Sequence, residues 1–179
     1  ASSASSASSA SSASPGTTAI SWTSAVGVAV ASGSLTKTAS TGWGNAGAIS
    51  TQTLAAGDGF AEFAVTETTT HRIFGLSAGN STANWDDVDF GLYLYGWSPI
   101  TVQVYESGAL RGKFGPFTAG DKMRVGVAGG VVAYSRNGTV FYTSTLKPTY
   151  PLLVDTSLYD LNATISSAVT CVTNAFVDA

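Results

Sequence analysis

The sequence predicts an all-β protein that folds as a two-sheet antiparallel sandwich in jelly-roll order. Apolar and polar residues alternate with a period of two in many short runs. About twelve such runs recur at a spacing of roughly 8–12 residues, and none has helical periodicity. Only 11% of the 179 residues are charged, against about 25% in an average globular domain. Because an open sheet of so many strands normally curls or splits, we expect two packed sheets.

The clearest element is an antiparallel meander over residues 120–145. Three alternating runs are joined there by two-residue turns, Gly129-Gly130 and Asn137-Gly138. These pairs supply the positive φ angles of type I′ or II′ hairpins. Alternation places one apolar set of side chains on a core face, so the rest of the chain must cover that face.

The other predicted strands are shorter or less regular. They cover residues 20–30, 34–39, 60–66, 72–76, 88–95, 101–106, 110–114, 152–155 and 163–173. On the first of them Trp22, Val26, Val28 and Val30 are expected to share one face, with Trp22 in the core. The run over residues 60–66 is apolar on both faces, which indicates a central strand.

The run over residues 88–95 is the most regular strand outside the meander. Phe90, Leu92 and Leu94 face one way, and Tyr93 and Tyr95 face the other. Glycine-rich or turn-rich loops are expected before it, over residues 41–48 and 79–85.

The chain divides into a tail and one domain. Residues 1–17 form a Ser/Ala-rich low-complexity tail or linker, which lacks the apolar side chains needed to bury surface. Residues 18–179 form the sandwich domain, large enough for a sizeable core. Its first and last strands, near Ile20 and Val169, are expected to pair.

Composition excludes several classes of partner and suggests a compartment. The net charge is −3, and the eight Lys and Arg residues are scattered, so no basic stripe indicates nucleic acid. No run of 18 apolar residues predicts membrane insertion. Cys171 is the single cysteine, so no disulfide can form within the chain, and it is expected in the core. A start rich in small residues suggests a secreted, extracellular protein.

A family resemblance becomes visible over roughly residues 85–157. It is carried by Gly120-Asp121, Val125-Gly126-Val127, residues 131–134, Asn137-Gly138, Phe141-Tyr142 and Tyr150-Pro151-Leu152. This pattern resembles the late strands of concanavalin A-like sandwiches, among them lectin, laminin-G and SPRY modules. The resemblance implies a twisted two-sheet sandwich and a binding or adhesive role outside the cell, and it assigns no binding residues.

Catalysis is predicted to be absent. Some concanavalin A-like sandwiches are glycosidases, whose chemistry needs one acid and one base or nucleophile beside the scissile bond. The nearest match is Asp87 and Asp89, which share a strand face, but Gly91 and Leu92 stand where the third acid would be expected. His71 is the only histidine, and it is expected at a strand edge, making a hydrogen bond. A catalytic triad or multi-histidine metal site is not indicated.

Calcium is the only cofactor that the sequence suggests. Asp86, Asp87 and Asp89 offer carboxylates, and Asn80 and Asn84 lie in the same loop. Calcium takes six to eight oxygen ligands. The alternative is a solvated acidic strand end, and we expect no cofactor.

Three tryptophans lie in or beside loops rich in Gly, Asn, Ser and Asp: Trp43, Trp85 and Trp97. Aromatic rings beside amides and carboxylates suit sugars, whose C–H faces are apolar and whose hydroxyls need polar partners. We therefore predict a carbohydrate site at these three residues with Asp86 and Asp87. The alternative is that they cap the sandwich or bury against another subunit.

Three Asn-X-Ser/Thr sequons begin at Asn80, Asn137 and Asn162. Each falls in a predicted surface turn, so each is a possible glycosylation site.

These observations predict an extracellular, non-catalytic carbohydrate-binding or adhesion module whose partners are glycans or cell-surface polymers. The alternative is a structural subunit of an extracellular filament or surface layer that self-associates through sheet edges and the N-terminal tail.

Overall fold

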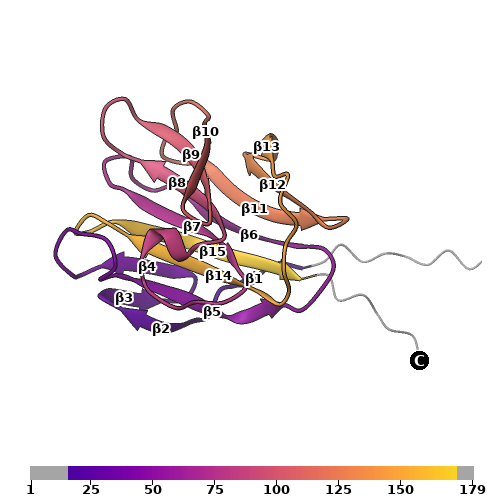
Figure 1. The fold of residues 1–179 in the computed structure, drawn as a ribbon. Coiled ribbons are helices and arrows are strands. Elements are labelled where there is room, and N and C mark those ends of the chain that lie inside the picture. Colours follow the sequence, from indigo (N-terminus) through magenta and orange to yellow (C-terminus); the bar gives the residue numbers. More distant parts are fainter. Residues whose placement is uncertain (1–15, 173–179) are drawn as a thin grey trace, which may run out of the picture.

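The computed structural model describes residues 16–172, which form a sandwich of two antiparallel sheets (Figure 1). The predicted tail therefore lies almost wholly outside the described residues, and its role as a linker stays a prediction. Within the described range there are fifteen strands and one short 3-10 helix. This confirms the predicted fold class.

The eight-stranded sheet has the order β13-β12-β11-β6-β15-β4-β3, with β1 paired to β15. Its strands are β1 (Thr18–Ala19), β3 (Val28–Ala31), β4 (Ser34–Lys37), β6 (Gly59–Ala64), β11 (Lys122–Ala128), β12 (Val131–Arg136), β13 (Thr139–Thr143) and β15 (Thr164–Val172). As predicted, β6 is central and the strands at the two ends of the domain pair, with Ala19 opposite Val169.

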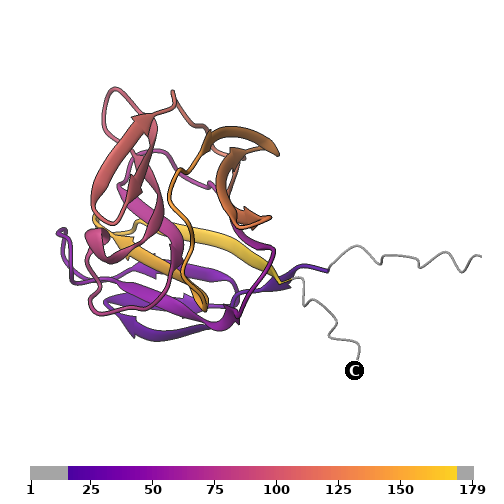
Figure 2. The same ribbon diagram turned by 45° about the vertical axis from the view of Figure 1, so that its right-hand side comes forward.

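The seven-stranded sheet has the order β10-β9-β8-β7-β14-β5-β2. Its strands are β2 (Trp22–Val26), β5 (Gly47–Leu54), β7 (Arg72–Ser77), β8 (Phe90–Tyr95), β9 (Thr101–Glu106), β10 (Ala109–Lys113) and β14 (Leu152–Leu158). The 3-10 helix η1 (Trp85–Asp87) packs next to β14. Turning the molecule shows the meander β11–β13 curling at one end of the sandwich (Figure 2).

The core lies between the two sheets and is filled by the alternating apolar residues. Phe63 of β6 meets Phe74 of β7, with ring centroids 4.7 Å apart. Met123, Val125 and Val127 of the meander are buried there as the alternation predicts. The meander turns also match, since Gly129, Gly130, Asn137 and Gly138 all have positive φ. Cys171 is buried, as expected.

Two details differ from the predicted strands. The first predicted strand, residues 20–30, is split into β2 and β3, because Gly27 has a φ of 58° and bends the chain from one sheet to the other. Consequently Val26 and Val30 are about half exposed and Trp22 is only partly buried. The second is β5, whose sequence GAISTQTL has few large apolar residues and therefore does not predict a strand.

No helix in residues 16–172 has the length and hydropathy that crossing a membrane requires.

Candidate aromatic groove

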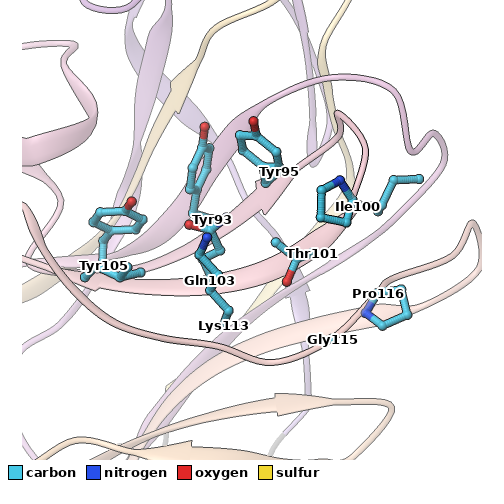
Figure 3. Close-up of a pocket in the computed structure, with 11 residues that line it drawn as sticks. Tyr93, Tyr95, Ile100, Thr101, Gln103, Tyr105, Lys113, Gly115 and Pro116 are labelled. Atoms are coloured by element: carbon cyan, nitrogen blue, oxygen red, sulfur yellow. The ribbon is translucent and has the colours of Figure 1, made fainter.

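The candidate site lies on the outer face of the seven-stranded sheet, where β8 and β9 run side by side. Leu92 and Leu94 point into the core, so Tyr93 and Tyr95 point outward. On β9 the same alternation turns Gln103 and Tyr105 outward, and Tyr93 pairs with Gln103 across the ladder. The three tyrosines stand in a row on one face (Figure 3). Their centroids are 6.1 Å apart for Tyr93 and Tyr95, and 5.5 Å for Tyr93 and Tyr105.

One end of this row is closed by two tryptophans from loops. Trp85 of η1 lies edge-on to Tyr105 at 5.1 Å, and Trp43 lies 5.7 Å from Tyr93. The two indoles are 6.4 Å apart. With Tyr93 and Tyr105 they line a hollow of about 210 Å³. An apolar hollow with few polar groups is the usual form of a small-ligand site.

A larger, shallower hollow of about 570 Å³ continues along the tyrosines toward β10. Its floor includes Gln103 and Thr101, and Lys113 reaches its edge (Figure 3). Burial raises the pKa of the Tyr93 phenol above its usual range, and the neighbouring phenols raise it further. The hydroxyl therefore stays protonated at neutral pH and can both donate and accept hydrogen bonds.

The other end of the row is closed by Trp97 and Tyr159, which surround His71. The imidazole lies 4.2 Å from Trp97 and 4.6 Å from Tyr95, and Trp97 and Tyr159 are 6.3 Å apart. We call this whole surface the aromatic groove. It consists of the tyrosine row, Gln103 and the rings that pack around the row: Trp43, His71, Trp85, Tyr93, Tyr95, Trp97, Gln103, Tyr105 and Tyr159.

A buried ammonium group fixes two of the loops that supply these rings. Lys37 is fully buried, and its Nζ donates hydrogen bonds to four oxygens: the carbonyls of Gly42, Leu158 and Tyr159 and the Oδ1 of Asn45. These distances are 2.6–2.8 Å, which is typical of charge-assisted bonds. Burial lowers the pKa of Lys37, and Asp160 partly offsets this effect. The ammonium thereby holds the loops of Trp43 and Tyr159 together.

The predicted site residues are only partly brought together. Trp43 and Trp85 meet at one end of the groove, whereas Trp97 lies at the opposite end with half of its surface exposed. The predicted carboxylates instead organise their own loop. Asp87 accepts hydrogen bonds from the backbone N–H groups of Ser81 and Thr82.

The pKa of Asp87 is lowered by its hydrogen bonds within the loop. Burial would raise its pKa, but the hydrogen bonds from Ser81 and Thr82 outweigh burial and hold it below the usual range. Asp86 accepts from the side-chain amide of Asn84 at 2.6 Å. Both carboxylates therefore position the Trp85 turn, and neither lines a hollow of the groove.

Sequence reasoning missed the tyrosine floor. The alternation placed Tyr93 and Tyr95 on the solvent side of one strand, and Tyr105 and Gln103 on the same side of the next. Strands that are consecutive in sequence usually pair. Outward-facing aromatic residues on both of these strands therefore predict an aromatic surface across them. His71 was expected to be a strand-edge residue making a hydrogen bond. It does make one, to Asp160, but it is buried at the end of the groove.

A metal centre is not formed by the predicted acids. In residues 16–172 no three His, Cys, Asp or Glu side chains lie close enough together to hold an ion. Asp89 accepts from the N–H of Ala78 and the hydroxyl of Ser107, while Asp87 accepts from Ser81 and Thr82. Asn80, Asn137 and Asn162 are all exposed, and their glycosylation stays a prediction.

No family model matches the chain, and no curated protein matches it. Solved structures do match. The carbohydrate recognition domain of Emp46p in its potassium-bound form has a TM-score of 0.60 at 10% identity, covering 84% of this chain and 88% of that one. The exoplasmic/lumenal domain of VIP36 bound to Ca²⁺ and Man3GlcNAc has a TM-score of 0.60 at 10% identity, covering 90% of each chain. The chain therefore has the concanavalin A-like fold that its sequence resembled.

A third structure corrects one prediction. A β-glucanase from Bacillus licheniformis has a TM-score of 0.50 at 12% identity and covers 83% of each chain. The prediction that the protein is not an enzyme is contradicted here, because an enzyme shares the fold. That prediction rested on the missing third acid after Asp87 and Asp89 and on the single histidine, His71.

Proposed function

We propose that the protein binds carbohydrate in the aromatic groove, with sugar rings stacked on the tyrosine row and hydroxyls bonded to Gln103 and the phenols. The observation that carries this proposal is the row itself. Tyr93, Tyr95 and Tyr105 project from two paired strands, so a rigid sheet presents their rings. Large apolar side chains facing solvent without a function are unusual in such numbers.

Two features of the groove favour sugars over purely apolar ligands. Each phenol combines an apolar ring with a hydroxyl, and Gln103 adds an amide with donors and an acceptor. A pyranose likewise has an apolar C–H face and a hydroxyl edge. In addition, the structures that share the fold include a VIP36 domain bound to Man3GlcNAc. That domain is exoplasmic or lumenal, and we propose a glycan ligand outside the cytosol for this chain as well.

The experiment is a binding survey with matched variants. Wild-type protein is run in affinity electrophoresis against immobilised gluco-, manno- and xylo-polysaccharides, with calcium and with a chelator. Trp85→Ala and Tyr105→Ala should each weaken binding at least about tenfold, which corresponds to about 1.4 kcal/mol. The matched control is Phe60→Ala, since Phe60 is a half-buried aromatic residue on the outer face of the other sheet.

Phe60→Ala should leave retardation unchanged. If wild-type protein is retarded by no polysaccharide, or if Phe60→Ala matches the groove variants, the proposal fails. New reducing ends are measured in the same incubations, because a β-glucanase shares the fold. Their appearance would show that the bound glycan is also cleaved.

A further inference from the structure

The end of the groove around His71 forms a separate hollow of about 250 Å³. It is lined by six aromatic rings: Trp43, His71, Tyr93, Tyr95, Trp97 and Tyr159. Trp43 and Tyr93 also line the hollow at Trp85. The two hollows therefore share a wall and lie next to each other along the tyrosine row.

The orientation and tautomer of His71 are fixed by one carboxylate. Asp160 Oδ2 accepts a hydrogen bond from the backbone N–H of His71 at 2.8 Å and lies 2.9 Å from its Nδ1. An ionised carboxylate only accepts, so the proton of the neutral imidazole lies on Nδ1. Nε2 consequently carries a lone pair and acts as an acceptor.

This acceptor has no protein partner. His71 is 2% exposed, and no group in residues 16–172 forms a hydrogen bond with Nε2. The surrounding side chains present rings, with Trp97 edge-on at 4.2 Å. Buried polar atoms are nearly always paired, and an unpaired one leaves its loss of hydration uncompensated. The site is therefore complete only with a donor from outside the chain.

We infer that this hollow is a second sugar subsite, in which a hydroxyl of the ligand donates a hydrogen bond to Nε2 of His71. The ligand would reach Nε2 past the side chain of Trp97. This indole is half exposed, and it lies on the loop after β8 directly against the imidazole. The inference rests on the proposed function and adds the ligand class. Since the two hollows adjoin, the ligand is an oligosaccharide that occupies both.

The charges around His71 favour an uncharged sugar. Asp160 lies against the imidazole, and its side chain is 17% exposed. The nearest cation, Arg72, is fully buried and paired with Glu67 at 2.6 Å, so it is not available to a ligand carboxylate. Lys37 is likewise buried beneath the carbonyl oxygens of Leu158 and Tyr159. A uronic acid would therefore meet the carboxylate of Asp160 without a compensating cation.

Binding should depend on pH through the same nitrogen. Burial lowers the pKa of His71 below its usual value, Arg72 lowers it further, and Asp160 and Glu67 oppose this. The remaining groups that face it are the phenols of Tyr93, Tyr95 and Tyr159, with Lys37 behind Asp160. At neutral pH Nε2 of His71 is therefore unprotonated and able to accept a hydrogen bond. As the pH falls through the lowered pKa, protonation removes the lone pair and affinity is lost.

The test uses the fact that His71 is the only histidine, so its imidazole ¹⁵N signals are unambiguous. The probes are cellohexaose, laminarihexaose and mannohexaose, with hexagalacturonate as the charged comparison. Saturation with the hexasaccharide that binds should shift the Nε2 signal and lower the His71 pKa further, because bound ligand and proton compete for one lone pair. Affinity should fall as the pH is lowered from 7.5 through the His71 pKa that the same ¹⁵N titration measures, and hexagalacturonate should bind at least tenfold more weakly.

Two variants separate this subsite from the groove as a whole. His71→Phe should weaken binding of the same hexasaccharide about tenfold at pH 7.5 and flatten its pH profile. Trp97→Ala changes an exposed residue, so the fold is kept, and should weaken binding while preserving the pH dependence. An unchanged Nε2 signal and pKa at saturation, with binding still abolished by Trp85→Ala, would overturn the subsite and leave the proposed function standing. Failure of all four hexasaccharides to bind would overturn the subsite, and the proposed function fails as well if no polysaccharide of the survey retards the protein.

Discussion

Asp155 shows how a single residue can make this fold sensitive to pH. It lies on the outer side of β14 under the loop of residues 78–88, and it is 3% exposed. Burial raises its pKa to about 7, although the hydroxyl of Ser77 donates to it at 3.0 Å and lowers the pKa in part. Asp87 and Asp89 raise the pKa further by repulsion. At neutral pH the folded protein therefore holds this carboxyl near the midpoint of its titration.

Asp155→Asn should make the protein more stable at pH 8 than the wild type. Between about pH 4 and pH 7 the unfolded chain releases this proton while the folded chain keeps it, so wild-type stability falls as pH rises. An amide removes that loss, whose maximum is about 4 kcal/mol. Urea unfolding at pH 4.5 and pH 8 measures the difference between the two proteins at each pH.

Asp121→Asn provides a control of opposite sign. Burial would raise the pKa of Asp121, but hydrogen bonds from Thr118 and Asn137 outweigh it and hold the pKa below its usual value. Its ionised form therefore stabilises the fold at neutral pH, and Asp121→Asn should lose stability there. An Asp155→Asn protein whose advantage does not grow from pH 4.5 to pH 8 would contradict the assignment of the raised pKa.

The sequence around each residue predicts part of the candidate site, and contacts that only the folded chain creates determine the rest. Trp43, Trp85 and Trp97 were predicted because loop aromatic residues beside amides and carboxylates suit sugars, and all three line the groove, while sugar binding by them stays a prediction. Asp86 and Asp87 were included because of their position, yet they serve the loop, and only the folded backbone reveals which N–H groups face them. The role of His71 depends on Asp160, which is 89 residues away in the chain.

At the level of elements, strands with strict alternation were predicted and strands without it were not. The meander and β8 combine large apolar residues on one side with reliable turn residues, so their faces match the structure, although β8 begins at Phe90 and not at residue 88. β5 lacks that contrast, and it is a strand because β14 and β2 pair with it on either side. Gly27 lies within an apparently continuous β run, and the sequence does not show that the chain changes sheets there.

The contact between β7 and β8 depends on a glycine. A Cβ at Gly75 would lie 2.1 Å from the carbonyl oxygen of Phe90 and 2.8 Å from a methyl group of Val88. Because one neighbour is backbone, β8 itself would have to shift. Tyr93 and Tyr95 of the tyrosine row lie on that strand, so their position is tied to the absence of a side chain at residue 75.

Gly75→Ala is therefore expected to destabilise the protein strongly, by more than about 3 kcal/mol, as overpacking against backbone does. Gly130→Ala is the comparison, since a Cβ there meets nothing within 4 Å and only the φ of 74° is unfavourable. That strain costs about 1 kcal/mol. Thermal and urea unfolding of both variants checks the order, and equal losses would contradict the close approach of β7 and β8.

At the level of the whole molecule, the fold class followed from composition, spacing and turns, and the groove did not. The two sheets are dictated by local patterns along the chain. The groove forms only where the outer face of β8 and β9 meets the loops that carry Trp43, Trp85 and Tyr159. Such long-range meetings depend on strand order, which alternation leaves open. Filament formation and self-association stay predictions, with the half-exposed Val26 and Val30 on the edge strands β2 and β3.

Because the groove carries so little charge, its affinity for glycans should depend only weakly on salt concentration. Of the described residues that line its three hollows, only Lys113 carries a formal charge at neutral pH. Mobile ions screen attraction between charges and leave ring stacking almost untouched. The dissociation constant for an uncharged glycan should therefore change less than about twofold between about 50 mM and about 1 M sodium chloride. Isothermal titration calorimetry at these two concentrations measures it, and a steep decline in affinity would indicate an ionic ligand.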